Sequence, residues 1–534
     1  MNKKDIVLVF VFILIVALAF FLRFYHLDER VFHHDESAVG YFTYKLFNDG
    51  TYSYDPAFHG PFMYYVTSEI YRHYGDTIYA SRLLPAVFGG AMLFLLVPLR
   101  KYIGKSGVVI SAFFFALSSS FLYYSRFYRE DIFISFFTLL ALVCAVKYAE
   151  GLAGKGYSIL RIFYLFIGAV ALASMAALKE NAYIIMALMV LFLILFIVRE
   201  RWYRGLIAKI RNRDTGTLIL IAEGSFIISA VLVIFSLYYT GKLLDLNGTQ
   251  AAFVKAVSHW YQMHSIQRIG GPLYFYIPII ALYELPVLVF GIAGIFHYYR
   301  KNAILMIFLG YWAMANLIVY SYIQEKVPWL VLNPLLPLVL IAGAYIGEVL
   351  SGKIIYNPKV RAAAVVFLVV SSSYFVYSSI FLNYYGYTNT AGPLIQAAQP
   401  PQRFSEFLGK IAETSRQYRN QSTEVQVADD GIETQFLWYL RHYPNVKWKV
   451  NIDSAELNAP LIVVKDTDEL HEPDIVQERL GSEYKRLDSA KMSWYWFTFE
   501  DIPHYLSPDY LLFRKMNVPP GEARVTLFYK PKIE

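Results

Sequence analysis

The chain has 534 residues, of which 57% are hydrophobic and only 17% are charged. This composition excludes an ordinary soluble domain and predicts a polytopic membrane protein. The net charge of +7 does not indicate a nucleic-acid partner, because the basic residues lie in short clusters between apolar runs, as the positive-inside rule describes.

The first apolar run, at about 6–22, has roughly the minimum length for a spanning helix. Lys3 and Lys4 precede it and no small-residue cleavage site precedes Arg23, so we interpret it as an uncleaved span with a cytoplasmic amino terminus. Further apolar runs follow at about 83–99, 107–125, 132–148, 160–178, 182–198, 217–239, 273–297, 303–322, 328–350 and 362–382. The predicted fold is an α-helical membrane protein with about eleven transmembrane helices.

The intervals that this register places in the cytoplasm should be basic, and each of them is. The residues are Arg100, Lys101 and Lys105; Lys147, Lys155 and Arg161; Arg199, Arg201, Arg204, Lys209, Arg211 and Arg213; Arg300 and Lys301; and Lys353, Lys359 and Arg361. The outer face then carries the first outer loop at 23–81, the turns at 126–131, 179–181 and 324–329, and the segment 240–272. Carboxylates and cations are therefore expected to converge there.

The first outer loop places His33, His34, Asp35 and Glu36 beside the bilayer. A carboxylate there is partly desolvated, so it is paired, metal-bound or shifted in pKa; the alternative is that Asp35 and Glu36 only cap a following helix. The four residues also look like a metal cluster. However, consecutive side chains point in different directions, so only one or two of them could bind a metal, with help from Glu130 or Asp131. A short helix on the membrane surface is predicted from Pro61 to about Tyr74.

Three cationic positions precede later spans on the same face. Arg126 and Arg129 are interleaved with Glu130 and Asp131, and arginine recognises phosphate through two parallel hydrogen bonds; the alternative is snorkelling at the interface. Two similar cases, each either a phosphate contact or an interfacial anchor, are Lys179 beside Glu180 and Lys326 beside Glu325. Trp329 is expected in the aromatic belt.

Residues 391–534 differ from residues 1–390, because charged residues become frequent and apolar runs shorten. Pro400 and Pro401 mark a linker. The predicted strands are Val425–Ala428, Val446–Val450, Leu461–Val464 and Tyr495–Phe499, with a helix at Glu433–His442. The sequence thus predicts a transmembrane domain at 1–390 and a soluble extracytoplasmic α/β domain at 391–534.

The outer face limits the chemistry that these residues can perform. Nucleotide-activated sugars are kept in the cytoplasm, so a transferase working outside needs a donor that arrives through the membrane. A sugar on a polyprenyl phosphate fits, because its phosphate needs Arg or Lys and the acceptor hydroxyl needs a carboxylate base.

At these residues the chain resembles the GT-C class of membrane glycosyltransferases, in particular the protein O-mannosyltransferase and lipid A aminoarabinose transferase group. It is most similar to the archaeal proteins labelled flippase-activity-associated, over about residues 1–385. The motifs that carry the resemblance are His33-His34-Asp35-Glu36, Ser125-Arg126-x-x-Arg129-x-Asp131, Lys179-Glu180-Asn181 and Glu325-Lys326-x-Pro328-Trp329-Leu330.

The resemblance implies that the first outer loop supplies the catalytic acid residue, which falls on Asp35, with Glu36 as its neighbour and second candidate. The donor phosphate would be held by Arg126, Arg129, Lys179, Lys326 and His59, with support from His33, His34, Glu180 and Glu325. His59 departs from the pattern, since it stands where aminoarabinose transferases have a lysine and histidine can be neutral at pH 7.

The implied reaction is a single inverting displacement. Asp35 accepts the proton of an acceptor hydroxyl on a protein, glycan or lipid, as that hydroxyl attacks a donor such as dolichyl-phosphate mannose. Some relatives use a divalent ion and others do not; Glu130 and Asp131 are the candidate ligands for Mg²⁺ or Mn²⁺. The alternative is a non-catalytic flippase or scaffold partner that binds polyprenyl-phosphate sugars.

Overall fold

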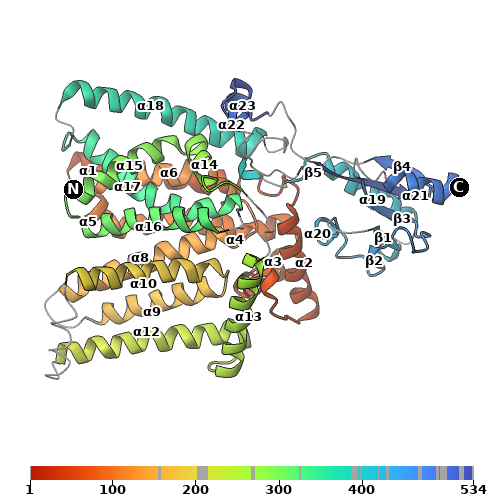
Figure 1. The fold of residues 1–534 in the computed structure, drawn as a ribbon, viewed down its shortest axis with the longest axis horizontal. Coiled ribbons are helices and arrows are strands. Elements are labelled where there is room, and N and C mark those ends of the chain that lie inside the picture. Colours follow the sequence, from red (N-terminus) through yellow and green to blue (C-terminus); the bar gives the residue numbers. More distant parts are fainter. Residues whose placement is uncertain are drawn as a thin grey trace.

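Figure 1 shows a bundle of long helices with a small sheet beyond one end of it. This computed structural model describes residues 2–153, 158–200, 215–265, 271–323, 326–354, 357–386, 394–396, 399–418, 420–428, 432–466, 472–488, 492–493, 502–515 and 522–531.

The described part of the chain has nine helices that are long and apolar enough to span a membrane. They are α1 (Lys3–Phe24); α4 (Ile78–Ala91) with η2 (Met92–Leu99) and α5 (Arg100–Ile103); α8 (Asp131–Ala153); α9 (Ile159–Ala176); α10 (Asn181–Arg199); α12 (Thr215–Thr240); α16 (Ile304–Tyr322); η3 (Pro328–Val331) with α17 (Leu332–Leu350); and α18 (Pro358–Ile380) with η4 (Phe381–Tyr385). The central one is α17, since 94% of its apolar window is buried.

Two further spans are sharply bent. The helices α6 (Lys105–Leu117) and α7 (Ser119–Ser125) meet at 60°, and α14 (Tyr276–Tyr283) and α15 (Leu285–Arg300) meet at 110°. The two breaks touch, because Glu284 accepts hydrogen bonds from Ser118 Oγ at 2.6 Å and Ser120 N at 3.1 Å. With the bent pairs counted, the spans number up to eleven among the described residues, which confirms the predicted architecture.

The first outer loop is more helical than expected. It folds into α2 (His34–Asp49), η1 (Pro56–Phe58) and α3 (Phe62–Tyr74), and the second of these long helices begins after Pro61 as predicted. Instead of lying free on a membrane surface, α3 packs on α2 and α4 and buries Phe62, Met63 and Tyr71. A separate helix, α13 (Leu246–Ser265), packs beside η1.

The C-terminal residues form one sheet with strand order β2-β1-β3-β6-β4, and β5 pairs with β6. The strands are β1 (Val425–Ala428), β2 (Val446–Val450), β3 (Leu461–Asp466), β4 (Lys485–Asp488), β5 (Met492–Ser493) and β6 (Glu522–Tyr529). The helices are α19 (Phe404–Gln417), α20 (Glu433–Phe436), α21 (Glu472–Leu480), α22 (Ile502–Tyr505) and α23 (Pro508–Phe513). Two apolar clusters bury the sheet on both faces, with Val425 and Val427 in one and Ile462 and Val464 in the other.

Three of the predicted strands match β1, β2 and β3, and the fourth, Tyr495–Phe499, lies outside the described residues. The predicted helix Glu433–His442 is helical only over α20 and continues as turns. Residues of α20 and of these turns bind the first outer loop. The Gln435 amide donates to Phe32 O at 2.8 Å, Ser37 Oγ donates to Gln435 O at 2.9 Å, and Arg441 Nε lies 2.7 Å from Asp76 Oδ2. The sheet is thereby fixed to the start of α2.

Candidate active site

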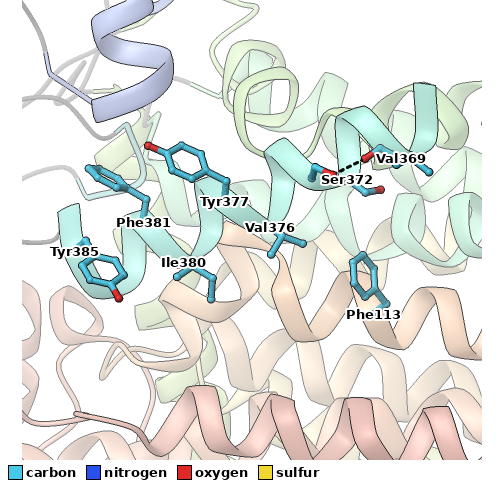
Figure 2. Close-up of a pocket in the computed structure, with 9 residues that line it drawn as sticks. Phe113, Val369, Ser372, Val376, Tyr377, Ile380, Phe381 and Tyr385 are labelled. Carbon is cyan, nitrogen blue, oxygen red and sulfur yellow. Dashed lines mark hydrogen bonds between the residues drawn. The ribbon is translucent and has the colours of Figure 1, made fainter. Parts of the chain in front are cut away.

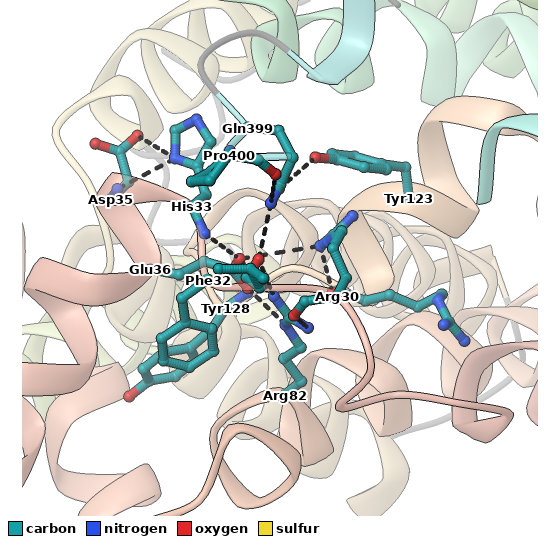
Figure 3. A network of polar contacts seen from close by, with 12 residues as sticks. Arg30, Phe32, His33, Asp35, Glu36, Arg82, Tyr123, Tyr128, Gln399 and Pro400 are labelled. Atoms are coloured by element: carbon teal, nitrogen blue, oxygen red, sulfur yellow. Dashed lines mark hydrogen bonds and ion pairs between the residues drawn. The ribbon is translucent and has the colours of Figure 1, made fainter. Parts of the chain in front are cut away.

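Asp35 and Glu36 lie in the first turn of α2, and His33 caps this turn. His33 has extended backbone angles; its Nδ1 accepts from Asp35 N at 3.1 Å, and its own N–H donates to Glu36 Oε2 at 3.0 Å. Because Asp35 and Glu36 are consecutive residues of a helix, their side chains leave it in different directions (Figure 3).

Glu36 points inward and is completely buried. It accepts hydrogen bonds from Arg82 Nε at 2.8 Å, Arg82 Nη2 at 2.7 Å and Tyr128 N at 2.8 Å (Figure 3). Burial opposes ionisation, but the charge and hydrogen bonds of Arg82 outweigh it and hold the pKa of Glu36 below its ordinary value. Both oxygens of the second catalytic candidate are therefore already bonded to protein groups.

Arg82 completes this network, although the sequence analysis did not identify it as a site residue. Its Nη1 donates to Arg30 O at 2.7 Å and Leu27 O at 3.1 Å, and its guanidinium is fully buried. The sequence held a signal for it, because an arginine inside the apolar run of α4 needs a partner. The network joins α2, α4 and the chain before α2.

Asp35 points toward the turn at 126–131 and is 24% exposed. It forms a close ion pair with Arg129, and His34 Nε2 lies 3.1 Å from Asp35 Oδ1. The Arg129 guanidinium also lies over the Trp329 ring, 4.0 Å from its centroid, and the Lys179 ammonium lies 5.7 Å from that centroid. Trp329 thus belongs to this cluster, and its expected place in an aromatic belt stays a prediction.

The acidic residues after Arg129 continue the charged cluster. Arg129 Nε lies 3.6 Å from both Glu130 Oε2 and Asp131 Oδ2, and Lys179 Nζ lies 3.2 Å from Asp131 Oδ1. Asp131 therefore lies between two cations. The structure brings Asp35, Arg129, Glu130, Asp131 and Lys179 together, although they come from the start of α2, the turn before α8 and the turn before α10.

His59 joins this cluster from the loop after η1. Its Nδ1 lies 2.9 Å from Glu180 Oε2, and its Nε2 lies 3.3 Å from Arg129 Nη2. Its φ of +66° is rare for a residue with a side chain, and the next residue must be glycine because a Cβ on Gly60 would lie 2.2 Å from Ala177 O. The loop is thus held against the turn that carries Glu180.

The two partners change each other's titration. Burial disfavours the charged form of His59, but the negative charges of Glu130 and Glu180 outweigh it and raise the pKa of His59. Burial likewise opposes ionisation of Glu180, and the charge and hydrogen bond of His59 lower the pKa of that carboxyl. His59 therefore lies within the cluster as an imidazole that is paired with the Glu180 carboxylate.

Arg126 and Lys326 both donate hydrogen bonds to backbone carbonyls. The Arg126 guanidinium donates to Leu22 O at 2.8 Å, Tyr25 O at 2.5 Å and His26 O at 2.9 Å, so it caps the end of α1. Lys326 is buried, its Nζ donates to Ile323 O at 3.0 Å, and burial lowers its pKa. Among the described residues it forms no ion pair, and Glu325 lies outside them.

A metal ion would find a different set of ligands from the predicted one. In the described part of the chain, one ligand atom each from His33, His34 and Asp35 lies within 4.8 Å of the others. Three consecutive residues can converge because the chain turns at His33, which the sequence argument did not foresee. Asp131 is a poorer ligand than predicted, since Lys179 and Arg129 flank it. Two imidazoles and one carboxylate suit a transition metal better than Mg²⁺.

A groove of about 750 Å³ runs along α18 and η4 (Figure 2). Its walls are Phe113, Val369, Ser372, Ser373, Val376, Tyr377, Ile380, Phe381 and Tyr385. It contains no charged side chain, so it offers an apolar surface without the groups that acid–base chemistry needs.

No family model and no curated protein matches the chain. Several solved structures, however, match its fold. ArnT from Cupriavidus metallidurans in the apo state is 16% identical and matches over 97% of both chains with a TM-score of 0.57. The same protein bound to undecaprenyl phosphate matches over 97% of both chains at 16% identity, with a TM-score of 0.53.

The archaeal oligosaccharyltransferase AglB from Archaeoglobus fulgidus, solved with an inhibitory peptide and a dolichol-phosphate, is 13% identical. It matches over 91% of this chain and 70% of its own, with a TM-score of 0.57. At these identities the similarity concerns the fold, and the chain has the fold of GT-C membrane glycosyltransferases. The finer resemblance to the flippase-activity-associated proteins is not tested and stays a prediction.

Proposed function

We propose that the protein is a membrane glycosyltransferase that moves a sugar from a polyprenyl-phosphate donor to an acceptor hydroxyl by inverting displacement. The GT-C fold supports the reaction class. The observation that carries the proposal is the Asp35–Arg129 ion pair, which puts a carboxylate and a phosphate-binding group side by side. The acceptor is a protein, a glycan or a lipid.

Asp35 is assigned as the base. An adjacent guanidinium favours the ionised form of a carboxyl group, which is the form that accepts a proton. As the acceptor hydroxyl attacks the anomeric carbon, its proton passes to Asp35 and the bond from that carbon to the phosphate oxygen breaks. Arg129 and Lys179 stabilise the polyprenyl phosphate that leaves, and Lys326, which has a buried ammonium, is assigned to the same task.

Other residues receive supporting roles. We assign Glu36 and Arg82 to holding the start of α2, and Arg126 to capping α1, because their hydrogen bonds are made to protein groups. His59 and Glu180 position Arg129. A divalent cation held by His33 and His34 would add positive charge to the cluster, whereas its binding to Asp35 as well would compete with the role of Asp35 as the base.

Undecaprenyl phosphate, bound by ArnT, and dolichol-phosphate, bound by AglB, support the donor class. We also propose that residues 1–390 carry the reaction and that residues 391–534 shape acceptor access, since the tail bonds to the loop that carries Asp35. The donor class is tested by competition: unlabelled polyprenyl phosphate should displace a labelled polyprenyl-phosphate hexose from the purified protein, and nucleotide sugars should not. Displacement by nucleotide sugars alone would contradict the proposal.

Replacing Lys179 by methionine should weaken binding of polyprenyl phosphate about 10-fold or more, because a charge-assisted contact contributes about 1.5–3 kcal/mol. Methionine keeps the length of the side chain. The matched control is Lys45→Met on the exposed side of α2, which should bind like the wild type. Binding is measured by titration in detergent, and equal affinity of Lys179→Met and the wild type would remove Lys179 from the phosphate site.

We propose that the face carrying the cluster is extracytoplasmic and that the amino terminus is cytoplasmic. In a Cys144→Ala background, Leu244→Cys, exposed after α12, should react with a membrane-impermeant maleimide in intact cells. Lys101→Cys, exposed at the end of α5, should react only after permeabilisation. The reverse labelling pattern would invert the orientation.

A further inference from the structure

Among the described carboxylates of the cluster, Glu130 receives the fewest hydrogen bonds. Its side chain is 1% exposed, and neither carboxylate oxygen has a hydrogen-bond partner among the residues that the structure describes. The Arg129 contact, at 3.6 Å, is too long for a hydrogen bond. By contrast, Glu36 has four donors and Asp131 has Lys179. A buried acceptor without donors is costly, so Glu130 needs hydrogen-bond donors that the described part of the chain does not supply.

The groups around Glu130 are aromatic and polar. Burial and, to a smaller extent, the charge of Glu130 raise the pKa values of Tyr52 and Tyr64, which lie in the loop after α2 and at the start of α3. The Tyr52 and Tyr64 rings lie 5.4 Å apart between centroids. The Tyr64 hydroxyl donates to Phe58 O at 2.6 Å, whereas the buried hydroxyl of Tyr52 has no hydrogen-bond partner within the described ranges. Glu130 and Tyr52 therefore both carry buried polar atoms that have no hydrogen-bond partner among the described residues, and the Tyr52 and Tyr64 rings lie against each other.

This combination fits a sugar ring. An ionised carboxylate only accepts hydrogen bonds, and two adjacent hydroxyls of a sugar can donate one bond to each of its oxygens. A tyrosine hydroxyl can donate to a third sugar oxygen, and tyrosine rings provide an apolar body with a polar tip, as sugar faces require. Glu130 also lies beside Arg129, which contacts both Asp35 and Asp131.

We propose that Glu130 and Tyr52 form the subsite for the glycosyl group of the donor, with Glu130 accepting from two adjacent sugar hydroxyls. The inference rests on the proposed function and adds to it which residues recognise the sugar. The donor then spans the cluster, with its phosphate near Lys179 and its sugar at Glu130. The reacting carbon between them lies near the Asp35–Arg129 pair.

The test compares two probes in the purified full-length protein: unglycosylated polyprenyl phosphate, and the polyprenyl-phosphate hexose that the wild type binds from a panel of glucose, mannose and galactose derivatives. Glu130→Gln keeps the shape of the side chain but replaces one acceptor oxygen by a donor. It should weaken binding of the hexose probe about 10- to 100-fold and leave binding of the sugar-free probe unchanged. Tyr52→Phe should show a smaller loss of the same kind.

Two control variants leave the subsite intact. Tyr65→Phe alters a partly exposed ring that lies 5.4 Å from Tyr52, and Glu69→Gln alters an exposed carboxylate of α3. Both should bind both probes like the wild type. Equal losses for the two probes in Glu130→Gln would overturn the subsite, and so would wild-type binding of the hexose probe.

A metal-ion role is distinguished in the same preparation. If Mn²⁺ binds the lipid-free wild type but not Glu130→Gln, and saturating Mn²⁺ leaves the two proteins equal in hexose affinity, Glu130 is a metal ligand and the inference fails. Failure of the proposed function looks different: the wild type itself would bind the hexose probe no better than the sugar-free one and would not consume it.

Discussion

Replacing Asp35 by asparagine is expected to lower turnover of a polyprenyl-phosphate sugar at least about 100-fold, the low end for a general base. Asparagine keeps the size of the side chain but cannot take the proton of the acceptor hydroxyl. Donor binding should survive and can even tighten, because Arg129 loses the carboxylate that competes with the donor phosphate for its charge. Turnover and binding are measured separately in one preparation.

The matched control is Asp49→Asn, because Asp49 is exposed at the other end of α2 and accepts a hydrogen bond from the exposed Asn48. It should keep wild-type turnover. Wild-type turnover of Asp35→Asn would remove the proposed base, since none of the other described carboxylates in the cluster is as exposed as Asp35.

Replacing Glu36 by alanine should destabilise the protein by about 3–5 kcal/mol, because it leaves the buried Arg82 guanidinium without its partner. Arg82→Ala should have an effect of similar size, and the double variant should lose less than the two single losses together. The measurement is thermal unfolding in detergent. Glu29→Ala, which removes an exposed carboxylate of the same loop, should change stability by no more than about 0.5 kcal/mol.

A further variant, Glu36→Gln, distinguishes a structural role of Glu36 from a role in the reaction. If Glu36→Gln unfolds at the wild-type temperature but loses turnover, Glu36 acts in the reaction and its structural assignment is wrong. If it loses stability and turnover together, and the folded fraction retains its activity, the network around Arg82 has the role assigned here.

The spans could be predicted because length and hydrophobicity alone determine them, and the positions of all eleven runs agree with the structure. Their bends could not, because a break such as Ser118 depends on a partner, Glu284, far away in the sequence. α2 was anticipated only in the alternative that Asp35 and Glu36 cap a following helix, and its extent was not predicted. Its face is buried by α3 and by the tail, so its sequence lacks the simple pattern of a surface helix. Strand β6 was missed although it is paired on both edges.

The sequence could predict which residues belong to the candidate site better than it could predict what each of them does. Charged residues beside spans indicated Asp35, Arg129, Asp131 and Lys179, and these do come together. Yet Arg126 and Glu36 have the same residue types and neighbouring positions, and only the direction of each side chain assigns them to capping and to a buried ion pair. Trp329 likewise needed the structure, because an aromatic belt and a cation-binding ring look alike in sequence.

The most direct test follows the sugar itself. The purified wild type in liposomes is given a labelled polyprenyl-phosphate hexose and a membrane extract as the source of acceptors, and the configuration of the labelled product at its anomeric carbon is determined. The proposed mechanism predicts label on a hydroxyl of the acceptor with inverted configuration, together with release of polyprenyl phosphate. Donor that is bound but recovered unchanged would favour the scaffold alternative, and a product with retained configuration would contradict single displacement with Asp35 as the base.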